Sequence, residues 1–135
     1  MKIKVLDFGA GRLPKRAHDN DAGADVYADT NFWLYPHKTV KIPLGFGLEL
    51  PDGYAGYIFP RSSLSAKGIV CELPPIDSGY RGEVHAIVTN CSSEPYLIAK
   101  HERIGQLVIM PVVIADFVTA RGAQRGAGAF GSTGR

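Results

Sequence analysis

Several short stretches of the chain alternate apolar and polar residues with a period of two. The apolar members are Ile3 and Val5 in "KIKVL", Phe46, Leu48 and Leu50 in "GFGLEL", and Val84, Ala86 and Val88 in "EVHAIVTN". Successive side chains of a β-strand point to opposite faces, so this alternation is typical of strands with one buried face. The pattern predicts half-buried strands at all three places.

Helical periodicity is confined to one short stretch. No run of a dozen residues spaces its apolar side chains at intervals of three and four. In "RSSLSAKG", however, Ser62 or Ser63 is a suitable N-cap for a helical turn, and Gly68 is a suitable residue to end it. The sequence therefore predicts a single helical turn in an otherwise β chain.

Turn-forming residues are frequent, with nine prolines and sixteen glycines along the chain. Short strands between closely spaced turns are typical of a β-sandwich or a jelly roll. A length of 135 residues fits one domain with its own core. We predict an all-β domain over residues 1–120 and a glycine-rich arm over residues 121–135.

Charge and apolar runs narrow the range of partners. A formal net charge of +2 is too small to indicate nucleic acid or an anionic membrane as a partner. The longest apolar run, "LVIMPVVIA", contains a proline and is far shorter than the ~20 residues that span a bilayer. No apolar core of a signal peptide follows the first lysines. Cys71 and Cys91 are therefore expected to be free thiols of a cytoplasmic protein.

The first stretch with chemical potential is "PRSSLSAKG". A helix start offers unpaired backbone amides to an anion. Arg61 adds a planar guanidinium, and Ser62 and Ser63 add hydroxyl donors. The alternative interpretation is a capped surface turn with a solvated arginine.

A second stretch, "PPIDSGYRGE", holds Asp77 in a turn stiffened by two prolines, with Tyr80 three residues further on. A carboxylate on a rigid loop can orient a water molecule and act as a general base. The alternative is an Asx turn, in which the aspartate bonds to its own backbone.

A third stretch, "DNDAGADVYA", brings Asp19, Asp21 and Asp25 close together in the sequence. Carboxylate oxygens suit Mg²⁺, which keeps several of its waters when it binds to protein. The spacing differs from that of an EF-hand loop, and a solvated acidic turn is the alternative.

The tail "RGAGAFGSTG" offers glycine amides and the side chains of Arg125, Ser132 and Thr133 as donors to phosphate. Phe130 provides a ring for stacking on a planar ligand. The tail lacks the lysine of a Walker A loop and leads into no helix, so it is not a P-loop signal.

These stretches, in this order, resemble the motifs of the trimeric dUTP diphosphatases (dUTPases). The five similar segments are "DAGADVYA", "PRSSLSAKG", "IDSGYRGEVHAIVTN", "ERIGQLVI" and "RGAGAFGSTG". The resemblance covers essentially the whole chain. It implies a jelly-roll β-barrel in a homotrimer, with active sites at the subunit interfaces and a flexible C-terminal arm that closes over them.

The resemblance also implies the reaction and the role of each residue. Water would attack the α-phosphorus of dUTP and release dUMP and pyrophosphate, with Mg²⁺ bridging the phosphates. Asp77 would activate the water, Tyr80 would lie under the deoxyribose and exclude a 2′-hydroxyl, and Asp25 would reach Mg²⁺ through its water shell. The phosphate ligands would be Arg61, Ser62, Ser63, Gln106, Arg125, Ser132 and Thr133. Phe130 would lie over the uracil, and Pro75, Ile76, His85 and Gly131 complete the expected substrate-binding set.

One segment departs from the family pattern. The hairpin Gly68–Asp77, "GIVCELPPID", is about two residues shorter than in common bacterial members and has no asparagine. In the family this hairpin reads the uracil edge and rejects the thymine methyl group. Cys71, Glu72 and Pro75 occupy the place of the usual readers.

Two alternatives remain open. The dCTP deaminases share the fold and a similar second motif, and Glu72 is a carboxylate at the base-reading segment, so a deaminase or a bifunctional deaminase–dUTPase is one alternative. The other is a dUTP-responsive regulatory binding protein, in which the nucleotide orders the arm and changes a partner surface.

Overall fold

The computed structural model describes residues 1–9 and 12–122, and their regular structure is almost entirely β. In chain order the elements are β1 (Lys4–Asp7), β2 (Ala24–Tyr27), β3 (Phe32–Leu34), β4 (Thr39–Pro43), β5 (Phe46–Glu49), β6 (Tyr54–Pro60), α1 (Ser62–Ala66), β7 (Ile69–Glu72), β8 (His85–Asn90), β9 (Tyr96–Ile98) and β10 (Arg103–Pro111). The predicted all-β class is confirmed. No helix in these described residues is long and apolar enough to cross a membrane.

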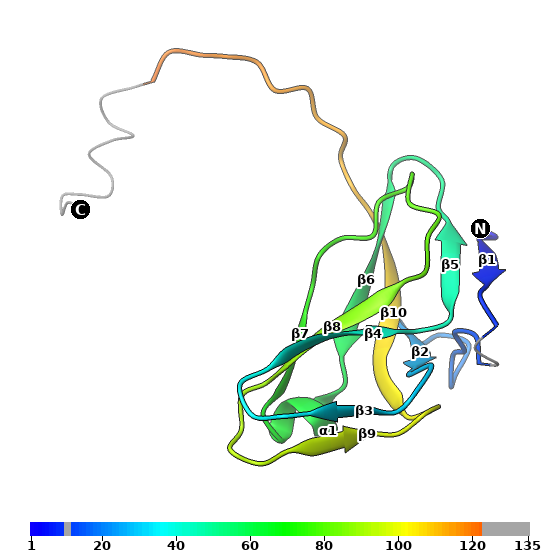
Figure 1. The fold of residues 1–135 in the computed structure, drawn as a ribbon. Coiled ribbons are helices and arrows are strands. Elements are labelled where there is room, and N and C mark those ends of the chain that lie inside the picture. The colour runs from blue at the N-terminus through cyan, green and yellow to red at the C-terminus, as the bar shows by residue number, and fades with distance from the viewer. Residues whose placement is uncertain (10–11, 123–135) are drawn as a thin grey trace.

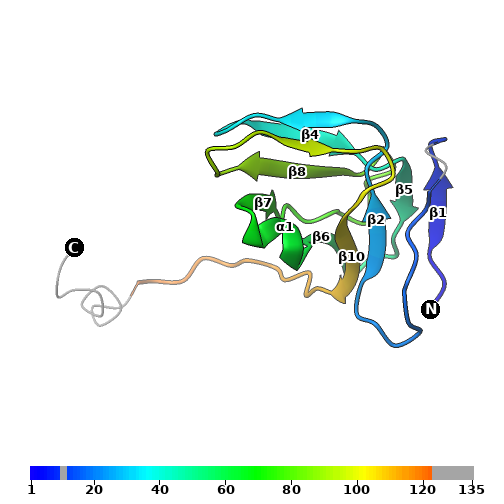
Figure 2. The same ribbon diagram turned by 90° about the horizontal axis from the view of Figure 1, so that it is seen from below.

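The strands pair in four antiparallel sheets. Their orders are β1–β5, β2–β10–β6, β3–β9 and β4–β8–β7. Figure 1 shows the strands arranged around one core, and Figure 2 shows β4 and β8 on one side of it with β2, β10 and β6 on the other. Most neighbours are distant in the sequence, so the fold depends on long-range pairing.

Two of the three predicted alternating strands bury the expected face. Phe46 and Leu48 of β5 are 1% exposed, and Val88 of β8 is also 1% exposed. Side chains from every sheet meet them in a single apolar core. At "KIKVL" a strand forms, but Val5 is 40% exposed, so the predicted burial is wrong there. The reason is that β1 pairs only with β5 and lies at the outer edge of the fold.

Asn90 is the one buried polar residue among the described residues, and its side chain joins three segments. Its amide donates to the carbonyl oxygens of Leu34, at 2.9 Å, and Glu94, at 2.8 Å. Its Oδ1 accepts from the backbone N–H of Ser92 at 2.9 Å and from the Ser92 hydroxyl at 2.7 Å. Buried polar groups cost little when all their hydrogen bonds are made, so this residue fixes the end of β8 against β3.

The helical turn forms where the sequence predicts it, but its N-cap differs. The N-cap is Arg61, with extended backbone (φ −88°, ψ 132°) and no side-chain cap hydrogen bond. The prediction that Ser62 or Ser63 caps the turn is therefore wrong: both serines lie inside the first turn and are exposed. Gly68 ends the turn as predicted, with a φ of +83° that favours glycine.

The chain leaves the folded body after β10. Residues 112–122 have no regular secondary structure and extend away from the sheets (Figure 1). Val113 is 90% exposed and Phe117 is 96% exposed, which is unusual for such apolar side chains. Most of the predicted arm, including Arg125, Phe130, Gly131, Ser132 and Thr133, lies outside the described residues. The domain boundary at residue 120 stays a prediction.

Candidate active site

The loop between β7 and β8 is fixed to the sheet at one point. Gly56 of β6 and Ile76 of the loop exchange both backbone hydrogen bonds, at 3.0 and 2.7 Å. Ile76 is thereby pinned against the start of β6, and the next residue, Asp77, turns outward. The stiff "PPI" segment and this bridge together give Asp77 a defined position.

Asp77 presents its carboxylate to solvent. Its backbone oxygen accepts the N–H of Tyr80 at 3.1 Å and closes the turn. Its carboxylate has no hydrogen-bond or ion-pair partner within residues 1–9 and 12–122. The Asx-turn interpretation is therefore wrong, because the backbone closes the turn and leaves the carboxylate oxygens available to a water molecule or a ligand.

Tyr80 is exposed but held in one orientation. Its hydroxyl donates to the carbonyl oxygen of Glu83 at 2.7 Å, while 45% of the residue stays accessible. The ring lies over Gly82, where an added Cβ would be 2.6 Å from the tyrosine oxygen. Glycine at this position therefore leaves the space that the tyrosine ring occupies.

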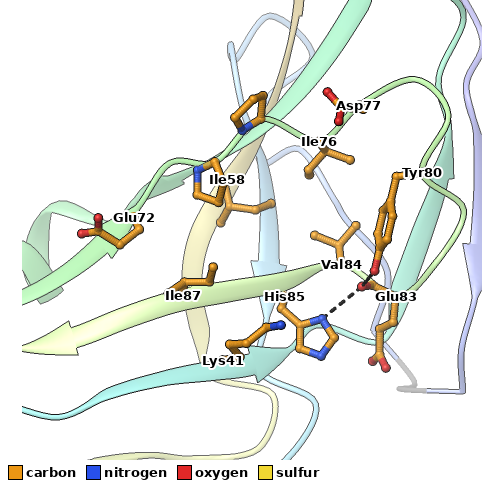
Figure 3. Close-up of a pocket in the computed structure, with 12 residues that line it drawn as sticks. Lys41, Ile58, Glu72, Ile76, Asp77, Tyr80, Glu83, Val84, His85 and Ile87 are labelled. Carbon is orange, nitrogen blue, oxygen red and sulfur yellow. Dashed lines mark hydrogen bonds between the residues drawn. The ribbon is translucent and has the colours of Figure 1, made fainter.

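His85 shares the same acceptor. Its Nδ1 lies 3.0 Å from the Glu83 carbonyl oxygen, and Figure 3 shows both bonds converging there. Because a carbonyl oxygen only accepts, this bond assigns the proton of the neutral imidazole to Nδ1 and leaves Nε2 as an acceptor. The Glu83 carboxylate in turn accepts the backbone N–H of Gly45 at 2.9 Å.

These residues surround a pocket of about 230 Å³. Figure 3 shows that the lining side chains come from the loop and from β4, β6, β7 and β8. Its lining residues are Lys41, Ile58, Glu72, Pro74, Pro75, Ile76, Asp77, Tyr80, Glu83, Val84, His85 and Ile87. The pocket thus brings together five residues that the sequence predicts for the site: Pro75, Ile76, Asp77, Tyr80 and His85.

Sequence reasoning missed Lys41 at this pocket. In the register of the sheet, Lys41 of β4 and Glu72 of β7 both pair with Ile87 of the central strand β8. Paired residues share a face, so a cation and a carboxylate flank Ile87 on the pocket side. Nothing local in "TVKIP" signals this position, because it arises from pairing with a strand more than forty residues away.

A second group of predicted residues gathers elsewhere, across β2, β10 and the end of β6. Asp25 pairs with Gln106, and the Asp25 carboxylate lies 3.4 Å from Nη1 of Arg103. Arg61 donates to the carbonyl oxygen of Arg103 at 3.3 Å. Ser62 follows at the start of α1, so the predicted phosphate ligands of the described chain lie in this one region. The sequence indicates no role for Arg103, because Arg103 and its partner Asp25 are 78 positions apart in the chain.

The two groups are separated within one chain. Ile76 lies opposite Gly56, near the start of β6. Arg61 directly follows the end of β6, five residues after Gly56. At about 3.3 Å per residue, roughly 17 Å of extended chain lies between Gly56 and Arg61. Asp77 and Arg61 therefore do not meet in one copy of the chain.

The acidic stretch before β2 does not form the three-carboxylate cluster suggested by its sequence. Asp21 accepts from the backbone and the ring of His18, at 3.0 and 3.1 Å. Within the described residues, no three histidine, cysteine or acidic side chains lie close enough to hold a metal ion. Asp25 alone, beside exposed Gln106, fits a role in which a carboxylate meets the water shell of an ion held mainly by a ligand.

Both cysteines are free thiols, as predicted. Cys71 is buried under the pocket wall, and its thiol donates to the carbonyl oxygen of Ile58 at 3.5 Å. Burial, with a smaller contribution from the charge of Glu72, raises the pKa of Cys71 to about 11. The thiol is therefore neutral at ordinary pH and serves packing rather than nucleophilic chemistry.

The fold is all-β, and it carries a pocket with the exposed Tyr80 ring and the Asp77 carboxylate and a separate cluster around Asp25 and Arg61. The dUTPase family model matches residues 10–134, so the chain belongs to the dUTPase family.

Curated relatives are similar in sequence over all or nearly all of the chain. A deoxyuridine 5'-triphosphate nucleotidohydrolase from Tropheryma whipplei (strain Twist) is 42% identical over 142 residues, covering 100% of this chain and 97% of the relative. The enzyme of the same name from Leifsonia xyli subsp. xyli is 44% identical over 93% of this chain and 87% of its own.

Solved structures are similar as well. A Staphylococcus bacteriophage 80alpha dUTPase, in a structure with dUpNHpp, is 28% identical with a TM-score of 0.84, and 99% of each chain is covered. A dUTPase from phage phi11 of S. aureus superposes with a TM-score of 0.85 at 23% identity, covering 92% of this chain and 99% of its own. The second similarity concerns the fold alone.

Proposed function

We propose that this protein hydrolyses dUTP to dUMP and pyrophosphate at sites shared between copies of the chain. The observation that carries the proposal is the unpartnered Asp77 carboxylate at the rim of the pocket, beside the exposed and oriented ring of Tyr80. A fixed carboxylate with free oxygens can accept a proton from a water molecule while holding it for attack.

The pocket suits a pyrimidine nucleoside. The exposed ring of Tyr80 stacks on the deoxyribose, and close packing there leaves no space for a 2′-hydroxyl. Along the exposed side of the pocket, Lys41 only donates hydrogen bonds and the Glu72 carboxylate only accepts them. This pair complements the O4 oxygen and the N3–H of uracil, and Pro75 and Ile76 close the side from which a C5-methyl would enter.

The phosphates extend to the second cluster. Arg61, Ser62, Ser63 and Gln106 bind phosphate oxygens, as the family resemblance implies. Little covalent work is needed in phosphoryl transfer, so positioning and charge neutralisation supply most of the acceleration. Mg²⁺ would supply charge neutralisation on the phosphates when bound, and Asp25 is the residue that would meet its water shell.

The separation of the two clusters supports assembly from several copies, and we propose the homotrimer of the family. Exposed Val113, Ile114, Phe117 and Val118 supply apolar surface for a neighbouring copy. The arm beyond them closes over the site, with Phe130 on the base, Gly131 beside it, and Arg125, Ser132 and Thr133 on the phosphates. Free thiols agree with a cytoplasmic location.

The test is a panel of four nucleotides. The protein is incubated with Mg²⁺ and, separately, with dUTP, dCTP, dTTP and UTP, and the products are resolved by chromatography. We expect dUMP and pyrophosphate from dUTP alone. Deoxyuridine products from dCTP would indicate a deaminase, in which Glu72 faces the base, and binding without turnover would indicate a regulatory nucleotide-binding protein.

A further inference from the structure

A small basic hollow lies beside Asp25, outside the residues that the family motifs assign to the phosphates. It measures about 240 Å³ and is lined by Arg12, Lys15, Arg16, Ala17, Asp25 and Tyr27. Four of these residues precede β2, and Asp25 and Tyr27 belong to β2.

The backbone places Lys15 directly next to the proposed site. Lys15 and Asp25 exchange both backbone hydrogen bonds, at 3.1 and 2.7 Å, as an isolated antiparallel bridge. Asp25 in turn pairs with Gln106. Opposed residues of antiparallel strands project to the same face with Cβ atoms about 5 Å apart, so the three side chains form one row. Lys15 therefore extends the row of Asp25 and Gln106 by one position.

Two of the three cations are already held in place. The guanidinium of Arg12 lies 3.9 Å from the centre of the Tyr27 ring, and Nε of Arg16 donates to the carbonyl oxygen of Asp21 at 2.8 Å. The Lys15 ammonium has no hydrogen bond or ion pair with any described residue. It is the cation free to receive a ligand.

The side chains that line the hollow carry a net positive charge. Its lining has three cations and one carboxylate, and that carboxylate, on Asp25, already lies 3.4 Å from Arg103. The nearby carboxylate of Asp21 is occupied by His18. An anion with several charges balances such a set, because each cation contributes separately to its attraction.

We infer that Lys15, in this hollow, is a further contact for the pyrophosphate end of the substrate, beside the phosphate ligands named above. The inference rests on the proposed function. Lys15 binds the terminal phosphates before cleavage and holds the pyrophosphate after it, while the nucleoside stays in the pocket at Asp77. The ammonium is a flexible point charge, which suits an oxyanion that must enter and leave.

The test compares Lys15→Met with a matched variant, Lys38→Met, which removes the same charge from an exposed turn at the far end of β4. Calorimetry measures the binding of inorganic pyrophosphate with Mg²⁺ to each full-length protein. Steady-state kinetics then measures inhibition by pyrophosphate and by dUMP. Since Lys15 is exposed and its backbone bonds are unchanged, we expect Lys15→Met to fold, and Lys15→Arg provides a charge-preserving variant.

We expect Lys15→Met to weaken pyrophosphate binding about two- to fivefold, the effect of one solvent-facing cation on an anion. Inhibition by dUMP should be unchanged, Lys15→Arg should bind pyrophosphate nearly as well as the original chain, and Lys38→Met should have no effect. Equal pyrophosphate affinities for Lys15→Met and Lys38→Met would overturn the inference, as would equal weakening of both products. Failure of the proposed function appears separately, as pyrophosphate binding without dUTP hydrolysis by the unmodified protein.

Discussion

If the site is divided between copies, two inactive variants should restore each other in a mixture. Asp77→Asn removes the proposed base at the pocket, and Arg61→Gln removes a cation from the second cluster. Roughly 17 Å of strand separates Gly56, which anchors the Asp77 loop, from Arg61. An intact site therefore needs Asp77 from one copy and Arg61 from another, and each variant supplies what the other lacks.

The expected recovery follows from random assembly. In an equal mixture, half of the loops carry Asp77 and half of the opposing surfaces carry Arg61, so about a quarter of the sites are intact. The two variants are unfolded together, refolded and assayed by proton release from dUTP. The mixture should reach about a quarter of the original rate per site, while each variant refolded alone stays near its own low rate.

A second mixture provides the control. Asp77→Asn and Tyr80→Leu alter the same loop, so no assembly of these two chains contains a complete loop. This mixture should stay inactive. Equal recovery in both mixtures, or none in either, would refute the division of the site between copies.

Two further predictions concern the pocket and its wall. Gly82→Ala should displace the Tyr80 ring, because the added Cβ would lie 2.6 Å from the tyrosine oxygen. We expect the KM for dUTP to rise about tenfold. Gly79→Ala, where a Cβ meets nothing within 4 Å, should leave KM unchanged, and equal effects of the two variants would contradict this. Burial raises the pKa of Cys71 from 9.0 to about 11, so the folded state holds its proton more tightly and stability is lost as the pH rises through that interval. Between about pH 8 and 10.5, the free energy of unfolding measured in urea should fall by about 2 kcal/mol less in Cys71→Ala than in the original chain. In Cys91→Ala it should fall as much as in the original chain.

The strands of the core are predictable from the sequence because alternation reports directly which face is buried. Phe46, Leu48 and Val88 show this, as each is nearly inaccessible. Val5 shows the limit, since alternation cannot tell a strand inside the sheet from one at its edge. Ser62 and Ser63 show a second limit: residue preference places a helical turn correctly but leaves its first residue uncertain by one or two positions.

The candidate site is predictable where one loop carries it and unpredictable where pairing assembles it. Asp77 and Tyr80 are three residues apart, so their proximity follows from the chain itself. Lys41 reaches the pocket through its register with Ile87, and Lys15 reaches Asp25 through an isolated bridge. Periodicity gives the face of a strand but not its partner, so neither position could be found from the sequence.

We expect water positioned by Asp77 to attack the α-phosphorus of dUTP. Hydrolysis in ¹⁸O-labelled water, followed by mass spectrometry of both products, tests it directly. The label should enter dUMP and be missing from pyrophosphate, and Asp77→Asn should lower kcat about 100- to 10,000-fold while dUTP still binds. Label in the pyrophosphate, or an undiminished kcat in Asp77→Asn, would contradict the account.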